Sequence, residues 1–181
     1  MFIPTKENFT EMSPVDFEKF VILLLEEQAE YLQNAEFKHN EILKVSDGEY
    51  QIDGTIRFEV MGVNFLTLVE CKKYNGAVTR EKVQVLFDKI RAVGAQKGIL
   101  ATTSYFQSGA ISYAKNHGIA LIQIVDGKLT YEVRSLNISD NIYYPDFLPR
   151  YTAIMQYQTA ENSITSSQVS GTNYLKEFLL E

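Results

Sequence analysis

The sequence predicts an α/β fold, in which helices flank a mixed β-sheet and a C-terminal extension follows. Segments with helical periodicity alternate with short strand-like runs, in the order α-β-β-β-α-β-α-β-β, which is typical of such a sheet. The 181 residues are 45% hydrophobic and 22% charged, a composition that fits one compact domain with a sizeable core. We therefore expect a domain over residues 1–134 and an extension over 135–181.

The first helix is expected to begin at Ser13-Pro14. Ser is a frequent N-cap residue, Pro is tolerated in the first turn, and apolar residues then recur at helical spacing in "VDFEKFVILLLEEQ". This pattern predicts a helix that ends near Asn34.

Three strand candidates follow this helix. The first link between them contains Ser46-Asp47-Gly48 and the second is Met61-Gly62, both of which are turn sequences. Such short links predict an antiparallel meander whose third strand, the most apolar, is central. The expected strands are residues 36–45, 50–60 and 63–72.

The second half of the chain continues the alternation. An amphipathic pattern closed by Gly94 predicts the next helix. The expected elements are a helix over 78–93, a strand over 97–103, a helix over 106–116, a strand over 118–124 and an edge strand over 128–134. The region 158–173, rich in Ser, Thr, Asn and Gln, predicts a polar linker. The final "NYLKEFLLE" predicts a helix docked on the chain's own core or on a second subunit.

Composition excludes several classes of protein. No long apolar run and no basic-then-apolar start is present, which indicates a cytoplasmic protein. The single cysteine, Cys71, cannot form an internal disulfide and has no zinc-ligand spacing around it. The net charge of −6 argues against a protein covered in basic residues. Positive charge is nevertheless concentrated in residues 70–97, which hold seven bases and three acids.

The stretch "LTLVECKKYNG" ends an apolar strand with Glu70 and Lys72. Side chains two residues apart on a strand face the same side, so this carboxylate and this ammonium should emerge together. A surface ion pair is the ordinary interpretation of such a triplet. The neighbouring "YQIDGTIRF" places Asp53 beside Gly54 on the expected partner strand, which would bring a second carboxylate close to Glu70.

Two adjacent carboxylates repel unless one is protonated or a cation lies between them. Hard cations such as Mg²⁺ take carboxylate, carbonyl and water oxygens as ligands. Asp53, Glu70 and the backbone carbonyl of Cys71 are therefore candidate metal ligands. Lys72 would orient the attacking water or stabilise negative charge in the transition state.

The order of these motifs resembles the PD-(D/E)xK nuclease signature, and the surrounding sequence resembles the Mrr-like restriction endonuclease family. The matching segments are "SPVDFEKFVILLLEE", "YQIDGTI", "LVECKKYNGAV" and "GAQKGILATTSYFQSGAISYAKNHGIALI", which together span about residues 13–127. The resemblance implies a restriction-endonuclease-like fold and Mg²⁺-dependent hydrolysis of DNA phosphodiester bonds, with Mn²⁺ as a substitute metal. Ile52 stands where the family signature has proline.

The resemblance also implies roles for individual residues. Asp53 and Glu70 become metal ligands, and Lys72 becomes the water-orienting base or electrostatic stabiliser. Glu18, in the first helix, matches a family acid that points into the site, although an exposed helix acid is an equal alternative. Gln84 would face the metal or a phosphate, against the alternative of a surface glutamine.

Basic residues flank the expected site. We favour Lys73 and Arg80 as DNA-binding residues. The alternative for each of them, and for Lys82, is a solubilising surface charge. The hydroxyls of Thr102, Thr103 and Ser104 precede a helix, where capping of backbone groups is the more common role and phosphate contact the less common one.

The leading expectation is a defence-type DNA endonuclease, and a homodimer is expected because one site cuts one strand. The alternative from another class is a nucleic-acid-binding or assembly subunit that keeps the fold with little turnover. Junction resolution or RNA cleavage within the same fold is a third alternative. Residues 135–181 are too short and too acidic for a separate DNA-recognition domain.

Overall fold

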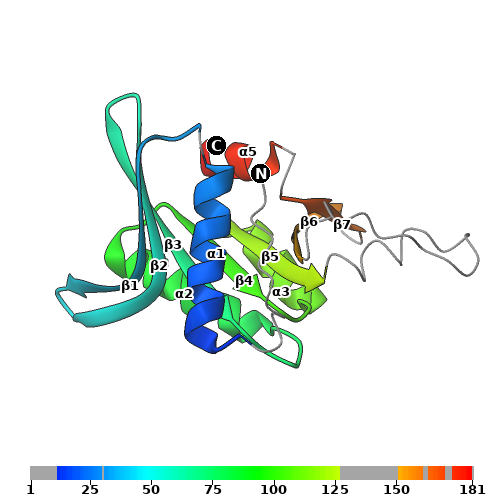
Figure 1. Cartoon of the computed structure of the whole chain (residues 1–181). Coiled ribbons are helices and arrows are strands. Elements are labelled where there is room, and N and C mark those ends of the chain that lie inside the picture. Colours follow the sequence, from blue (N-terminus) through cyan, green and yellow to red (C-terminus); the bar gives the residue numbers. More distant parts are fainter. Residues whose placement is uncertain (1–11, 30, 127–150, 161–162, 170–172, 181) are drawn as a thin grey trace, which may run out of the picture.

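The protein contains one seven-stranded sheet whose strands lie side by side in chain order (Figure 1). The computed structural model describes residues 12–29, 31–126, 151–160, 163–169 and 173–180. The strands are β1 (Gln33–Val45), β2 (Gly48–Val60), β3 (Val63–Lys72), β4 (Lys97–Thr102), β5 (Ile119–Asp126), β6 (Tyr151–Ala160) and β7 (Ser163–Gln168). The helices are α1 (Pro14–Gln28), α2 (Arg80–Val93), α3 (Ser108–Lys115) and α5 (Tyr174–Leu180).

The sheet is mixed, as predicted. Strands β1, β2 and β3 form the expected antiparallel meander. Strands β3, β4 and β5 are parallel, because helices α2 and α3 carry the chain back between them. Strands β6 and β7 then add to β5 in antiparallel pairing. This order leaves β3 as the junction between the antiparallel and parallel parts of the sheet.

Helices cover both faces of the sheet, which gives three layers (Figure 1). The α1-side cluster includes Phe17, Phe20, Leu25, Ile56, Val69, Ile99, Ile122, Leu175 and Leu179. The α2-side cluster, to which α3 also contributes, includes Ile52, Leu68, Val83, Leu86, Ile90, Leu100, Ile111 and Leu121. Side chains that alternate along each strand therefore reach two separate hydrophobic cores.

Local sequence signals explain where the helices begin and end. Ser13 caps α1, with its hydroxyl oxygen accepting a hydrogen bond from the backbone N–H of Asp16 at 3.1 Å. Gly94 ends α2 in the left-handed conformation, with φ 70°. The prediction that the first helix reaches Asn34 is wrong. The helix ends at Gln28, and Asn34 has a φ of 51°, a conformation that a helix residue does not adopt.

The C-terminal part adds to the same sheet and core. The prediction of a polar linker over 158–173 is wrong for the residues of β7, because Ser and Thr side chains are compatible with an exposed strand. Leu175 and Leu179 of α5 are buried in the α1-side cluster, so this helix docks on the chain's own core. The expected edge strand over 128–134 lies outside the described residues. The domain boundary at residue 134 stays a prediction.

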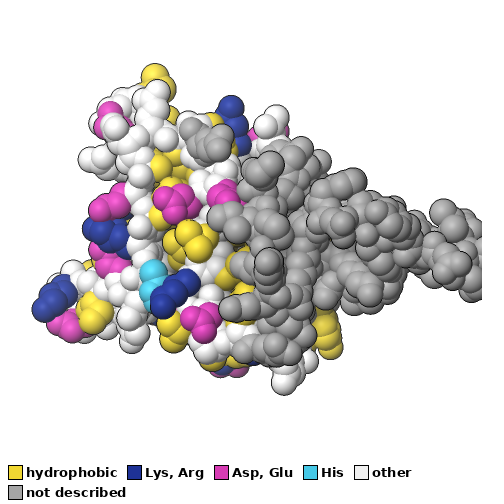
Figure 2. All heavy atoms as spheres, in the orientation of Figure 1, with side chains coloured by type: hydrophobic (Ala, Val, Ile, Leu, Met, Phe, Trp, Pro, Cys, Tyr) yellow, Lys and Arg dark blue, Asp and Glu magenta, His cyan; other side chains and the backbone are white. Residues whose placement is uncertain are grey.

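Charged side chains of both signs alternate along the β1–β2 side of the molecule (Figure 2). Several of them pair with each other: Arg57 lies 2.7 Å from Glu41, and Lys38 lies 3.0 Å from Glu36. Such mutual pairing leaves little net positive charge there to attract a polyanion. None of the helices in the described ranges is long and apolar enough to cross a membrane.

Candidate active site

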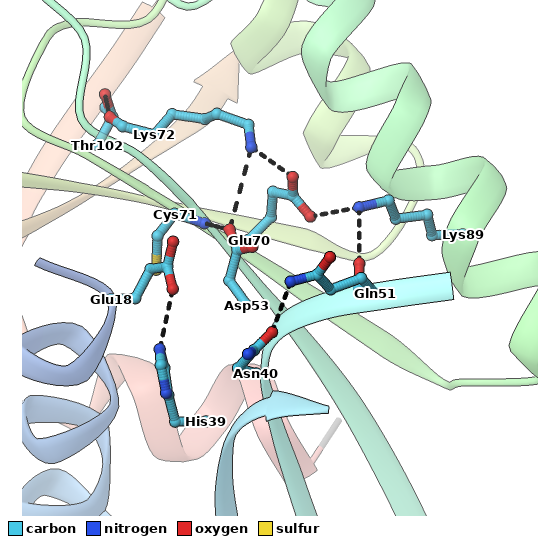
Figure 3. A network of polar contacts seen from close by, with 10 residues as sticks. All are labelled: Glu18, His39, Asn40, Gln51, Asp53, Glu70, Cys71, Lys72, Lys89 and Thr102. Carbon is cyan, nitrogen blue, oxygen red and sulfur yellow. Dashed lines mark hydrogen bonds and ion pairs between the residues drawn. The ribbon is translucent and has the colours of Figure 1, made fainter. Parts of the chain in front are cut away.

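The polar end of β3 lies next to the middle of β2. Gly54 pairs with Val69 across the two antiparallel strands, so the residue before Gly54 lies beside the residue after Val69. These are Asp53 and Glu70. The expected proximity of the two carboxylates is therefore present in the structure (Figure 3).

Asp53 is tied to β3 by a hydrogen bond rather than only by strand pairing. Its Oδ2 accepts a hydrogen bond from the backbone N–H of Cys71 at 2.7 Å. Strand β2 is irregular at this point, because Ile52 packs in the α2-side cluster while Ile56 packs in the α1-side cluster. In a regular strand these two residues would face the same side. The break in alternation at Asp53-Gly54 orients the Asp53 carboxylate toward the end of β3.

Gly54 is required by the close approach of α1. A Cβ atom at this position would lie 2.1 Å from Ile22 Cδ1 and 3.0 Å from Ile22 Cγ1. The first distance is far below van der Waals contact and the second is tight, so a larger residue would force the Ile22 side chain, whose terminal methyl is the nearest atom, to turn away from β2. The glycine beside Asp53 therefore lets α1 pack directly over the strand that carries the acid.

Glu70 is held between two lysines. Its Oε1 lies 2.5 Å from Lys72 Nζ and its Oε2 lies 2.9 Å from Lys89 Nζ (Figure 3). Because Leu68 packs in the α2-side cluster, Glu70 and Lys72 also face α2, the helix that supplies Lys89. The side chain of Glu70 is only 8% exposed, whereas that of Lys72 is 22% exposed. The carboxylate is thus recessed and its ammonium partner is nearer the solvent.

Burial and charge push the pKa values of the two acids in opposite directions. Burial, and next the negative charge of Glu70, raise the pKa of Asp53. Burial also opposes ionisation of Glu70, but its hydrogen bonds to Lys72 and Lys89 and their charges outweigh burial and lower its pKa. Burial disfavours the charged form of Lys72, yet the hydrogen bond and charge of Glu70 raise its pKa. Glu70 and Lys72 are consequently an ion pair at neutral pH.

The backbone of Lys72 is fixed by β4. The Thr102 hydroxyl donates a 2.7 Å hydrogen bond to the Lys72 carbonyl oxygen and accepts one from Ser104 N–H at 3.1 Å. The Thr103 hydroxyl donates to the Tyr74 carbonyl oxygen at 3.0 Å. Thr102 and Thr103 therefore bond backbone groups of β3, of the segment after it and of the loop after β4, but they do not cap α3, whose N-cap is Gln107. Thr102 secures the point where β3 leaves the sheet.

A second polar pair lies on the α1 side of the site. His39 Nε2 lies 2.9 Å from Glu18 Oε2, which joins β1 to α1. Glu18 is close enough for its charge to contribute to the raised pKa values of Asp53 and Cys71. Burial is the largest cause of the raised pKa of Cys71, so its thiol is neutral. The structure therefore brings Glu18 near the acids, with His39 as its hydrogen-bond partner (Figure 3).

The remaining candidate residues lie farther from the acids or contact other groups. Gln84 is exposed on α2 and, five residues before Lys89, points about 140° around the helix from it. Arg80 is exposed, with its guanidinium carbon 5.0 Å from the centre of the Tyr113 ring. Lys73 is half-buried beside the end of β3. All three assignments stay predictions.

The donor set at the end of β3 fits a hard divalent cation. No three His, Cys, Asp or Glu side chains form a metal-binding group in the described part of the chain. Two carboxylates and one backbone carbonyl would leave the other positions to water and phosphate, which is the usual arrangement for Mg²⁺. In the metal-free protein the ammonium groups of Lys72 and Lys89 neutralise Glu70, which shows that this carboxylate attracts positive charge.

Two residues at the site, Lys89 and His39, were not predicted from the sequence. Lys89 lies on the flank of the amphipathic α2, one residue before the buried Ile90, where a lysine is usually a surface charge. His39 lies across from Gly54 in the β1–β2 register, so only the strand pairing places it near the site. The sequence signal for Lys89 was its position on the helix next to the buried residues of α2. Using this signal required knowing how α2 packs over β3, which the sequence does not show.

Comparison with known proteins identifies the family. A family model described as "Restriction endonuclease" (Mrr_cat) matches residues 9–128, well over half of the chain. A solved structure titled "Crystal Structure of Protein of Unknown Function AF1548" is similar over 60% of this chain and 57% of its own, with a TM-score of 0.51 and 24% identity. This chain thus spans little more than half of that protein, and the similarity shows the fold alone. No curated protein sequence matches. The chain belongs to the Mrr_cat family of restriction endonucleases, the Mrr-like branch of the PD-(D/E)xK nucleases.

Proposed function

We propose that this nuclease is a metal-dependent DNA endonuclease that hydrolyses phosphodiester bonds with Asp53, Glu70 and Lys72. The observation that supports this most is the convergence of the three side chains at the end of β3, where Lys72 Nζ lies 2.5 Å from Glu70 and 4.0 Å from Asp53. Two carboxylates beside an ammonium are the groups that metal-assisted phosphodiester hydrolysis needs.

Asp53, Glu70 and the Cys71 carbonyl would hold the metal, for which we propose Mg²⁺ with Mn²⁺ as a substitute. When bound, such an ion polarises a phosphoryl oxygen and lowers the pKa of a bound water. Asp53 and Glu70 would hold the ion in a fixed position because each is anchored, Asp53 by the Cys71 N–H and Glu70 by Lys72. The anchored carboxylates lose little freedom when a cation binds.

Lys72 is proposed to stabilise negative charge at the phosphate. Its raised pKa keeps the side chain protonated at neutral pH, so it donates hydrogen bonds rather than removing a proton. A protonated lysine can orient the attacking water and neutralise the charge that develops on the phosphoryl oxygens. We therefore favour the stabiliser role over the base role for Lys72.

The other proposed residues act around this centre. Glu18 is proposed as a further acid of the site, because its negative charge contributes to the raised pKa of Asp53. Lys73 and Arg80 are proposed to bind backbone phosphates, since they lie in the one strongly basic stretch of the sequence, residues 70–97. For Gln84 we retain a contact with phosphate as the weakest of these proposals.

The biological setting is also a proposal. The description of the family as restriction endonucleases supports a role in defence against foreign DNA.

A homodimer would place two active sites on opposite strands of the DNA. In the C-terminal helix α5, Leu175 and Leu179 are buried in the core of the chain. Only the exposed face of α5 therefore remains for a contact between subunits. Analytical ultracentrifugation of the intact chain tests this, and a monomer at micromolar concentration would contradict it.

Plasmid cleavage tests the proposal. We expect wild type to nick supercoiled plasmid with Mg²⁺ or Mn²⁺ and not with EDTA, and Asp53→Ala and Lys72→Ala to lose at least about 100-fold in rate. Asp47→Ala, a change at an exposed turn acid before the same strand, is the matched control and should cut like wild type. Equal nicking by all four proteins would identify a contaminating nuclease. DNA binding without metal-dependent nicking would instead favour the assembly-subunit alternative.

A further inference from the structure

Lys89 makes a contact that the proposed chemistry does not use. Its Nζ lies 2.9 Å from Glu70 Oε2 and 3.3 Å from the backbone carbonyl oxygen of Gln51. The Lys89 side chain is 20% exposed and comes from α2, whereas Glu70 belongs to β3. This lysine therefore links a helix to the recessed acid of the site (Figure 3).

The two oxygens of Glu70 are each occupied by an ammonium group, Oε1 by Lys72 and Oε2 by Lys89. Each carboxylate oxygen has two lone pairs, but a divalent ion bound there would lie close to an ammonium group, and the repulsion between the two cations favours displacement of one lysine. The two lysines differ in how firmly they are held. Lys72 lies on the same strand as Glu70, with its carbonyl bonded to Thr102, and also faces Asp53.

Lys89 is the more easily displaced of the two. Its second contact, to the Gln51 carbonyl, is long at 3.3 Å, and four methylene groups connect its ammonium to the helix. When Lys89 leaves Glu70, the ammonium remains tethered within a side-chain length of the end of β3. A DNA phosphate at the site would be the nearest strong anion for it.

We propose that Lys89 is an exchangeable counter-ion of Glu70. In the metal-free protein it neutralises the recessed carboxylate, and on metal and DNA binding it moves to a backbone phosphate of the DNA. Lys89 is thus a positioning residue in the free protein and a substrate contact in the complex. This inference rests on the proposed function, because it needs Glu70 to bind metal.

Metal affinity tests the first half of the proposal. Titration calorimetry with Mn²⁺ alone compares wild type with Lys89→Met, Lys89→Arg and Lys82→Met. Lys82 is the matched control, since it lies on the same helix about 10 Å away and its loss changes the net charge equally. Removing the competitor should tighten binding about fivefold in Lys89→Met relative to Lys82→Met. Lys89→Arg keeps a competing cation and should bind like wild type.

The results separate this inference from the proposed function. If wild type binds no Mn²⁺, the metal site itself is wrong. If wild type binds Mn²⁺ but Lys89→Met and Lys82→Met have equal affinities, only the counter-ion role of Lys89 is overturned. Far-UV circular dichroism identical to wild type is required of each variant, and Lys89→Gln, which also removes the charge, replaces Lys89→Met with the same expected gain in affinity if Lys89→Met fails to fold.

Salt-dependent DNA binding tests the second half. Binding of a short duplex by wild type and by Lys89→Met is measured against salt concentration, with and without Ca²⁺, an oxygen-ligated cation used under conditions where no cleavage is detected. Lys72 is kept, because its removal would leave Glu70 Oε1 without a counter-ion and open to the metal. With the metal, adding Lys89→Met should lower the slope of log affinity against log salt by about 0.9, the value of one phosphate contact. Without the metal, Lys89 stays on Glu70 and the slope should not change. An unchanged slope with metal present would overturn the DNA contact.

Discussion

Asp53 Oδ2 accepts a 2.7 Å hydrogen bond from the backbone N–H of Cys71, so an acid from β2 is fixed against the strand that carries the second acid. This bond holds two carboxylates together that would otherwise repel each other. Burial and the charge of Glu70 raise the pKa of Asp53, which means that the site stores unfavourable electrostatic energy in the metal-free protein. Several measurable consequences depend on this relationship.

Replacing Asp53 should stabilise the metal-free protein. A carboxyl whose pKa is higher in the folded state destabilises the fold once it ionises, so the penalty is complete above the folded pKa and absent below the unfolded value near 3.8. Asp53→Asn keeps an oxygen for the Cys71 N–H but carries no charge. We expect added stability near pH 7 in urea denaturation with EDTA, and none near pH 3. A variant that is less stable than wild type near pH 7 would contradict this.

Replacing Glu70 should have the opposite effect. Its folded pKa is lower than the unfolded value near 4.5, so its ion pairs stabilise the fold above that value and are lost as the pH falls through the folded pKa. Glu70→Gln leaves Lys72 and Lys89 without their partner and should cost about 1–3 kcal/mol near pH 7. The same denaturation series, continued into acid, should show the two proteins converging. A constant difference at all pH values would indicate a packing effect instead.

The packing of α1 over β2 predicts an effect at Gly54. A methyl group there would lie 2.1 Å from Ile22 Cδ1, so Gly54→Ala should cost about 1–3 kcal/mol and reduce cleavage by displacing the neighbouring Asp53. Ile22→Val removes Cδ1 and should restore part of both losses in the double variant. The control is Gly76→Ala, where nothing lies within 4 Å of the added carbon. Thermal melting with equal midpoints for Gly54→Ala and Gly76→Ala would refute the close approach.

The bond between β4 and the backbone of Lys72 predicts a further loss. Thr102 is fully buried, and Thr102→Val removes the 2.7 Å hydrogen bond to the Lys72 carbonyl oxygen while keeping the side-chain shape. We expect a cost of about 1–3 kcal/mol in chemical denaturation, because the buried Ser104 N–H loses its acceptor and the Lys72 carbonyl keeps only the N–H donors of Tyr74 and Thr103. Thr103→Val, at a more exposed hydroxyl that bonds Tyr74, should cost less. Equal costs for the two variants would mean that the Thr102 hydroxyl adds nothing to these backbone donors.

The central features of the site were predictable because they depend on short-range geometry. The two-residue spacing of Glu70 and Lys72 puts them on one face of a strand, and the Met61-Gly62 link makes β2 the neighbour that carries Asp53. Ser13 and Gly94 marked helix ends for equally local reasons.

Long-range packing explains what could not be predicted. The rotation of α2 over the sheet decides that Lys89 reaches Glu70, and this rotation follows from the burial of Val83, Leu86 and Ile90. Strands β6 and β7 have too much Ser, Thr and Gln for a strand pattern to stand out, and the pairing of β6 with β5 and of β7 with β6 supplies the stabilisation.

The most direct test of the two-carboxylate site is calorimetric titration of Mg²⁺ in the presence of a short DNA duplex. It compares Lys72→Met, which prevents cleavage, with the double variant Lys72→Met/Asp53→Ala. We expect binding when Asp53 is present and a loss of at least about tenfold in affinity when it is replaced. Equal affinity with and without Asp53, or no Mg²⁺ binding by either protein, would contradict the assignment of Asp53 and Glu70 as the metal ligands of this nuclease.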